Sequence, residues 1–197
     1  RATRGSTEEF RTFTIAQFLH TAGDGAVALA LANTLFFAVP LGEARGKVAL
    51  YLLLTMVPYA VVAPFLGRLV DRSRLGGRRI LVAGFALRTL MAWALTARID
   101  SLLVFPLTLV VLVSSRAHGI TRTSMVPELR PPTRSLMWAN TWMSVVSSAG
   151  GAVGGIAAVA VVQVGGSGGA MALATVLYAA GVLFAFVLPR HSTPHAR

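Results

Sequence analysis

The chain contains six long apolar runs, separated by short segments rich in charge, Gly or Pro. A helix needs about 20 apolar residues to cross a hydrocarbon core about 30 Å thick. Because the runs are apolar throughout, whereas barrel strands alternate, they predict helices rather than strands. Only 13% of the residues are charged, against about 25% in soluble domains. The sequence therefore predicts an all-α integral membrane protein with spans at 13–39, 48–66, 80–97, 102–119, 138–162 and 169–188.

The basic residues are distributed unevenly over the predicted loops. Six spans place both termini on one side, together with the second–third and fourth–fifth loops, and most of the 18 Lys and Arg residues lie there. By the positive-inside rule this side is cytoplasmic. All basic residues except Lys47 are Arg, which is typical of GC-rich bacterial genes. We therefore expect a multi-pass protein of a bacterial inner membrane, with cytoplasmic segments at 1–12 and 190–197 flanking a helical bundle at 13–189.

The same distribution accounts for the net charge of +11. A basic excess confined to the loops of one side is topological, so we expect membrane lipids as partners and no nucleic acid. The chain has no Cys, which excludes disulfides and thiolate metal sites. His20 and Asp24 would provide only two ligands, which is too few for a metal site. No set of side chains suited to catalysis is evident. We expect no enzyme activity, no cofactor and no metal.

Charged residues inside the predicted spans are the main functional candidates. A charge near the bilayer centre costs at least about 2.5–3.5 kcal/mol, so it faces the bundle interior or water and has a partner. By helical rise, Asp24 and Arg88 lie near the midplane, and Arg116 lies deep in the fourth span. Asp24 is either a proton- or cation-coupling carboxylate or one member of a permanent ion pair with Arg88 or Arg116. His20 is either a hydrogen-bonded packing residue or a proton relay.

The predicted loop between the second and third spans concentrates charge in the sequence GRLVDRSRLGGRR, residues 67–79. It resembles the signature loop of the major facilitator superfamily, G-x-x-x-D-R-x-G-R-R, although Ser73, Arg74 and Leu75 lengthen it. The alternative is an ordinary positive-inside loop. The resemblance implies a cytoplasmic gate formed by Gly67, Asp71, Arg72, Gly76, Arg78 and Arg79.

A second stretch strengthens this resemblance. Residues 124–140, SMVPELRPPTRSLMWAN, are similar to a segment common in the branch of macrolide-, siderophore- and lysophospholipid-exporter-like proteins. Trp138 and Trp142 in and after this stretch are expected to anchor the fifth span at the interface, and Trp142 is also a candidate for stacking on an aromatic substrate.

The fifth predicted span contains a run of glycines with two interpretations. It is close to the G-P-x-x-G-G exporter motif of superfamily antiporters, with Gly151 where the family has Pro. It also contains two overlapping G-x-x-x-G pairs, a general close-packing face of membrane helices. The residues concerned are Gly150, Gly151, Gly154 and Gly155.

The resemblance extends over essentially the whole chain but matches only the N-terminal half of a twelve-span superfamily protein. It implies two inverted three-helix repeats, spans 1–3 and 4–6, with Asp24 and Arg116 lining a central cavity and Arg88 as a counter-ion. The implied function is half of an alternating-access transporter that exports small amphipathic or drug-like molecules. A second six-helix half would come from the same gene, a homodimer or a partner protein. The alternative is a non-transporting module that acts as a membrane scaffold or subunit.

Overall fold

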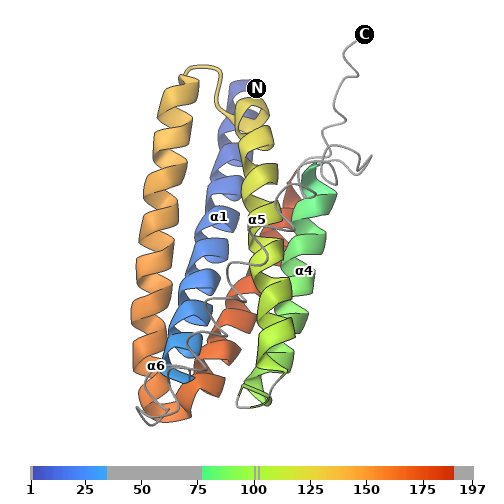
Figure 1. Cartoon of the computed structure of the whole chain (residues 1–197). Coiled ribbons are helices and arrows are strands. Elements are labelled where there is room, and N and C mark those ends of the chain that lie inside the picture. The colour runs from blue at the N-terminus through green and yellow to red at the C-terminus, as the bar shows by residue number, and fades with distance from the viewer. Residues whose placement is uncertain (1, 35–76, 100, 102, 189–197) are drawn as a thin grey trace.

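The computed structural model describes residues 2–34, 77–99, 101 and 103–188. This part of the chain is helical throughout and contains no strand, so the predicted all-α class is confirmed. Each of its four helices is long and apolar enough to cross a membrane. They are α1 (Ala2–Ala32), α4 (Gly77–Thr96), α5 (Val104–Leu129) and α6 (Leu136–Val187), shown in Figure 1.

The described residues thus contain four long helices where the sequence predicted six spans. The predicted span at 48–66 lies outside the described residues. The predicted spans at 138–162 and 169–188 both fall within α6, whose 52 residues comprise two helices joined across a kink. Gly166, with φ 60° and ψ −164°, has a non-helical backbone and sharply changes the direction of the chain at this kink. Figure 1 shows α6 turning back on itself, and we call 136–165 and 167–187 its first and second arms.

A short turn joins α5 to the first arm of α6, which runs antiparallel to it, and α1 lies between the two (Figure 1). Pro127 lies inside the last turn of α5, and the backbone leaves the helix at Arg130. Ser135 then caps α6, because its Oγ accepts a hydrogen bond of 3.1 Å from the Trp138 backbone N–H. Such a cap satisfies one of the unpaired amides of a helix start.

Small residues allow α1 and the first arm of α6 to approach closely. A Cβ added at Gly154 would lie 2.6 Å from the Ala22 Cα, and one at Gly150 would lie 2.7 Å from the Phe18 carbonyl oxygen. Gly155, in contrast, has no atom within 4 Å of such a Cβ. The pair Gly150 and Gly154 therefore forms the close-packing face predicted by the G-x-x-x-G interpretation.

The second arm of α6 packs against α1 and α4, again through a glycine. A Cβ at Gly181 would lie within 2.7 Å of the Phe85 ring, and Phe85 has no solvent exposure. Arg88 and Tyr178 are the two largest fully buried side chains in the described residues. The centre of this bundle is therefore polar, and its geometry defines the candidate site.

Candidate functional site

Asp24, on α1, contacts each of the other three described helices. Its carboxylate accepts a hydrogen bond of 2.6 Å from the Tyr178 hydroxyl of α6 at Oδ1 and one of 2.7 Å from the Ser115 hydroxyl of α5 at Oδ2. The guanidinium of Arg88, from α4, lies 3.9 Å from Oδ1. The Arg88 Cζ also lies 5.2 Å from the centre of the Tyr178 ring, within cation–π range. The predicted pairing of Asp24 with Arg88 is thus present in the structure.

Arg88 has no solvent exposure, and each nitrogen of its guanidinium has a contact within the protein. Its Nε donates to the Gly84 carbonyl oxygen at 3.0 Å. One terminal nitrogen contacts Nδ1 of His20, and the other lies 3.2 Å from Nδ1 of His118. The Phe85 ring covers one face at 5.0 Å. A buried cation needs this full set of partners, because unpaired charge in a low-dielectric interior is costly.

These contacts fix the tautomers of both histidines. Guanidinium nitrogens only donate, so Nδ1 of each imidazole must accept, and the proton of each neutral ring lies on Nε2. Nε2 of His118 then donates to Oε1 of Gln17 at 3.0 Å, and Nε2 of His20 points at Asp24 at 3.6 Å. The two rings are tilted by 31° to each other, with centres 3.8 Å apart. His20 therefore lies between Arg88 and Asp24, with Nδ1 in contact with the guanidinium and Nε2 within ion-pair distance of the carboxylate.

The network continues from the histidines to the first arm of α6. Nε2 of Gln17 donates to the Ser147 hydroxyl oxygen at 2.8 Å, and Arg122 donates to the same oxygen at 3.2 Å. The Ser147 hydroxyl in turn donates to the Met143 carbonyl oxygen at 2.7 Å. A continuous chain of polar contacts therefore runs from Asp24 to Arg122 and involves all four described helices.

A cavity of about 310 Å³ lies beside this network, between α1 and α5. His20, Asp24, Ser115 and Arg116 supply its polar wall, and the remainder is mainly aliphatic. The positive charge of Arg116 attracts the Asp24 carboxylate. The Asp24 side chain is 34% exposed while that of Arg88 is fully buried. The structure thus brings the two predicted cavity residues together and places Arg88 behind the carboxylate, away from the cavity lining.

Two partners of Asp24 and one of Arg88 were not predicted from the sequence. His118 did carry a signal, since it is a polar residue within a predicted span and lies two positions after Arg116. Ser115 and Tyr178 carried none, because hydroxyl residues are common in apolar spans and Tyr178 is 154 positions from its partner Asp24. Within the described ranges, no three His, Asp or Glu side chains converge to hold a metal ion.

The structure describes only part of the predicted gate loop. Gly67, Asp71, Arg72 and Gly76 lie outside the described residues. Arg78 and Arg79 belong to the first turn of α4, where Arg79 is exposed. Arg78 donates a hydrogen bond of 2.5 Å to the Phe186 carbonyl oxygen and lies 5.2 Å from the Phe186 ring. Arg78 therefore joins the start of α4 to the end of α6.

The chain is similar to mycobacterial proteins of greater length. It is 40% identical over 147 residues to the uncharacterized protein ML2143 of Mycobacterium leprae, covering 71% of this chain and 25% of that protein. The uncharacterized protein Rv0876c of Mycobacterium tuberculosis matches at the same identity, with 26% of its length covered. The chain thus spans about a quarter of the length of these relatives. No protein-family model and no solved structure matches the chain.

Proposed function

We propose that this chain is one half of a secondary active transporter of the major facilitator type, which exports small amphipathic or drug-like molecules across a bacterial inner membrane by alternating access. The observation that carries the proposal is the cavity between α1 and α5, with the Asp24 carboxylate on its wall and the buried Arg88 behind it. Ionisable groups at such a depth are costly and typically mark a substrate or ion pathway.

The directions of the helices support six spans. α1 and α4 both begin at the end of the bundle that carries the N-terminus, so α1 ends at the end opposite to the start of α4 (Figure 1). The predicted span at 48–66 would make the return between them. The two arms of α6 would supply the fifth and sixth spans, which completes two three-helix repeats of the inverted type.

The contacts of Asp24 suggest how the cavity would couple to helix packing. The carboxylate belongs both to the cavity wall and to the network, so a proton or a cationic substrate arriving in the cavity would reduce its attraction for Arg88. Arg88 would then be held by His20 and His118, which are neutral acceptors in this geometry. A local charge change would thereby bias the packing of α4 against α1 and α5, as switching mechanisms require.

A second half would be needed to enclose the substrate. The relatives are roughly four times as long as the stretch that matches them, so the remaining length of such a protein would accommodate further spans. A homodimer or a partner protein would serve the same purpose. Cavity specificity would then depend on both halves.

One observation favours the alternative, a non-transporting module that acts as a membrane scaffold or subunit. Nearly every polar atom of the network from Asp24 to Arg122 has a hydrogen-bond partner, and a fully bonded network rigidifies a core. In that case Asp24 and Arg88 would form a permanent ion pair that fixes the helices.

A transport assay distinguishes the transporter from the scaffold. The protein encoded by the whole native reading frame is reconstituted in liposomes, and efflux is measured. We expect an imposed pH gradient to drive efflux of a fluorescent lipophilic cation such as ethidium. Asp24→Asn should remove the pH dependence of the efflux, whereas Glu8→Gln, an exposed acidic position on the same helix, should leave it intact. Unchanged pH dependence with reduced stability in Asp24→Asn would assign Asp24 to packing. Absence of efflux, with co-purification of an unrelated membrane protein, would support the scaffold.

A further inference from the structure

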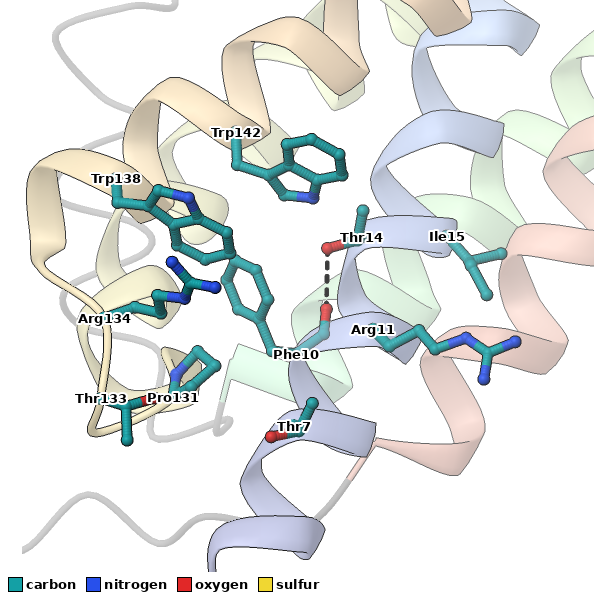
Figure 2. Close-up of a pocket in the computed structure, with 10 residues that line it drawn as sticks. All are labelled: Thr7, Phe10, Arg11, Thr14, Ile15, Pro131, Thr133, Arg134, Trp138 and Trp142. Carbon is teal, nitrogen blue, oxygen red and sulfur yellow. Dashed lines mark hydrogen bonds between the residues drawn. The ribbon is translucent and has the colours of Figure 1, made fainter.

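A second and larger cavity lies at a different level of the bundle from Asp24, closer to the start of α1. It has a volume of about 420 Å³ and is formed by the first turns of α1, the α5–α6 turn and the first turns of α6 (Figure 2). This is the end of the bundle that carries the N-terminus (Figure 1). The residues that matter most to its chemistry are Phe10, Arg11, Arg134, Trp138 and Trp142.

Three aromatic rings form one wall of this pocket. Trp138 and Trp142 are one turn apart on α6, and their rings are parallel to within 2° with centres 6.1 Å apart. The Phe10 ring of α1 lies 5.7 Å from that of Trp138. Phe10 is buried, whereas Trp142 is 44% exposed. The pocket therefore offers a broad apolar surface that is accessible from outside.

Arg134 supplies a positive charge directly on this wall. Its Cζ lies 4.8 Å from the centre of the Trp138 ring, which holds the guanidinium in place by a cation–π contact. Its backbone completes the turn, accepting from Arg130 and donating to Pro131. The guanidinium pairs with no carboxylate in the described ranges, and the pocket lining contains no acidic residue. This charge is therefore preorganised and uncompensated.

Arg11 adds a second positive charge at the rim. It is exposed on α1, and Figure 2 shows its side chain directed away from the two indole rings. The hydroxyl of Thr14 is already bonded to the Phe10 carbonyl oxygen at 2.8 Å. Electrostatic attraction at this pocket therefore favours an anion, and Arg134 is the group placed to bind it.

We propose that this pocket binds a phosphate-bearing amphiphile of net negative charge, with the phosphate at Arg134 and the apolar part along Trp138 and Trp142. The Arg fork matches phosphate geometry and bonds it in a bidentate manner. Tryptophans at the ends of membrane helices lie at headgroup level, where anionic lipids attract basic side chains. The ligand is either a phospholipid of the adjacent leaflet or a soluble phosphate ester. The proposal concerns a different pocket from that of Asp24 and is independent of transport.

The two pocket tryptophans make binding directly measurable. The chain has three tryptophans, so Trp93→Phe leaves Trp138 and Trp142 as the only indole emitters. The full chain in uncharged detergent micelles is titrated with brominated phosphatidylglycerol or brominated phosphatidylcholine, since bromine quenches indole at short range. We expect the anionic lipid to reach half-maximal quenching at about a tenfold lower mole fraction, the effect of one charge-assisted contact.

Two further variants test the role assigned to Arg134. Arg134→Gln should abolish the preference for phosphatidylglycerol. Arg79→Gln removes a charge from an exposed position at the same end of the bundle but outside the pocket, and should retain the preference. Equal quenching by both lipids, or a preference that survives Arg134→Gln, would overturn the proposal and leave the tryptophans as simple interfacial anchors.

A competition experiment distinguishes a phospholipid ligand from a soluble phosphate ester. Octyl phosphate is added below its micellar concentration to the sample quenched by brominated phosphatidylglycerol. Recovery of fluorescence that depends on Arg134 assigns the pocket to a soluble phosphate ester. Quenching that persists assigns it to the phospholipid.

Discussion

Arg88 places a full positive charge at a position with no solvent exposure. Its contacts with Asp24, His20, His118 and the Gly84 carbonyl oxygen, together with the Phe85 and Tyr178 rings, offset the lost hydration. Asp24 can be reached from the cavity, whereas Arg88 cannot. The two members of the pair therefore have different potential roles: the carboxylate can respond to a ligand, and the guanidinium can transmit that response to the helices behind it.

Removing Arg88 should therefore be strongly destabilising. Arg88→Met leaves the Asp24 charge without its buried partner, and breaking such a pair typically costs about 3–5 kcal/mol. We expect a large fall in the free energy of unfolding, measured by SDS titration of the detergent-solubilised protein with circular dichroism as the readout. The control Arg98→Met, at an exposed position, should change it by less than about 0.5 kcal/mol.

The double variant Arg88→Met with Asp24→Asn should recover part of this loss. Because both charges are then absent, neither is left buried without a partner. A double variant whose loss equals the sum of the two single losses would show that Asp24 and Arg88 are not energetically coupled.

At the scale of the helices, the close contact between α1 and the first arm of α6 depends on which glycines face the partner. Gly154→Ala would place a methyl group 2.6 Å from the Ala22 Cα, an overlap with backbone that typically costs about 1–3 kcal/mol. Gly155→Ala has open space and should gain up to about 1 kcal/mol from helix propensity. Thermal unfolding of the two variants in one detergent compares them directly. Equal melting temperatures would contradict the close-packing role.

The same glycines show how far the sequence determines the elements. The apolar runs predicted where the described helices occur, because length and hydropathy decide whether a segment can span a bilayer. They did not predict the helix ends, since α1 begins at Ala2, before the predicted span at 13–39, and α5 continues to Leu129, beyond the predicted span at 102–119. The overlapping pairs Gly150/Gly154 and Gly151/Gly155 are equivalent in sequence, so only the rotation of α6 about its axis selects the first. The sharp change of direction occurs at Gly166, within the Gly-rich stretch at 165–169.

The charged residues of the site could be predicted from the sequence, but the residues that hydrogen-bond to them could not. Asp24, Arg88 and Arg116 were conspicuous because charge is rare inside apolar runs. Tyr178 and Ser115 could not be predicted as partners, because their hydrogen bonds to Asp24 join segments far apart in the chain. The continuation of the network through Gln17 to Ser147 likewise depends on how α1 packs against α6.

At the scale of the whole molecule, the number of crossings decides whether the six-span proposal holds. α1 and α4 begin at the same end of the bundle, and α5 returns to that end before α6 begins (Figure 1). The two arms of α6 again leave this end and return toward it. An even number of spans with both termini on one side follows only if the chain also crosses between α1 and α4.

Cysteine labelling tests the part of this topology that follows α4, because the chain has no Cys of its own. Single cysteines are introduced as Thr133→Cys in the α5–α6 turn, Ala97→Cys just beyond α4 and Ser192→Cys near the C-terminus. By the positive-inside rule, an impermeant maleimide should label only Ala97→Cys in intact spheroplasts, and only the other two in inverted vesicles. Labelling of Ser192→Cys from the same side as Ala97→Cys would mean an even number of crossings after α4, in place of the three that α5 and the two arms of α6 would make. If each of the three cysteines were labelled only from the side opposite to that expected, the protein would have the opposite orientation.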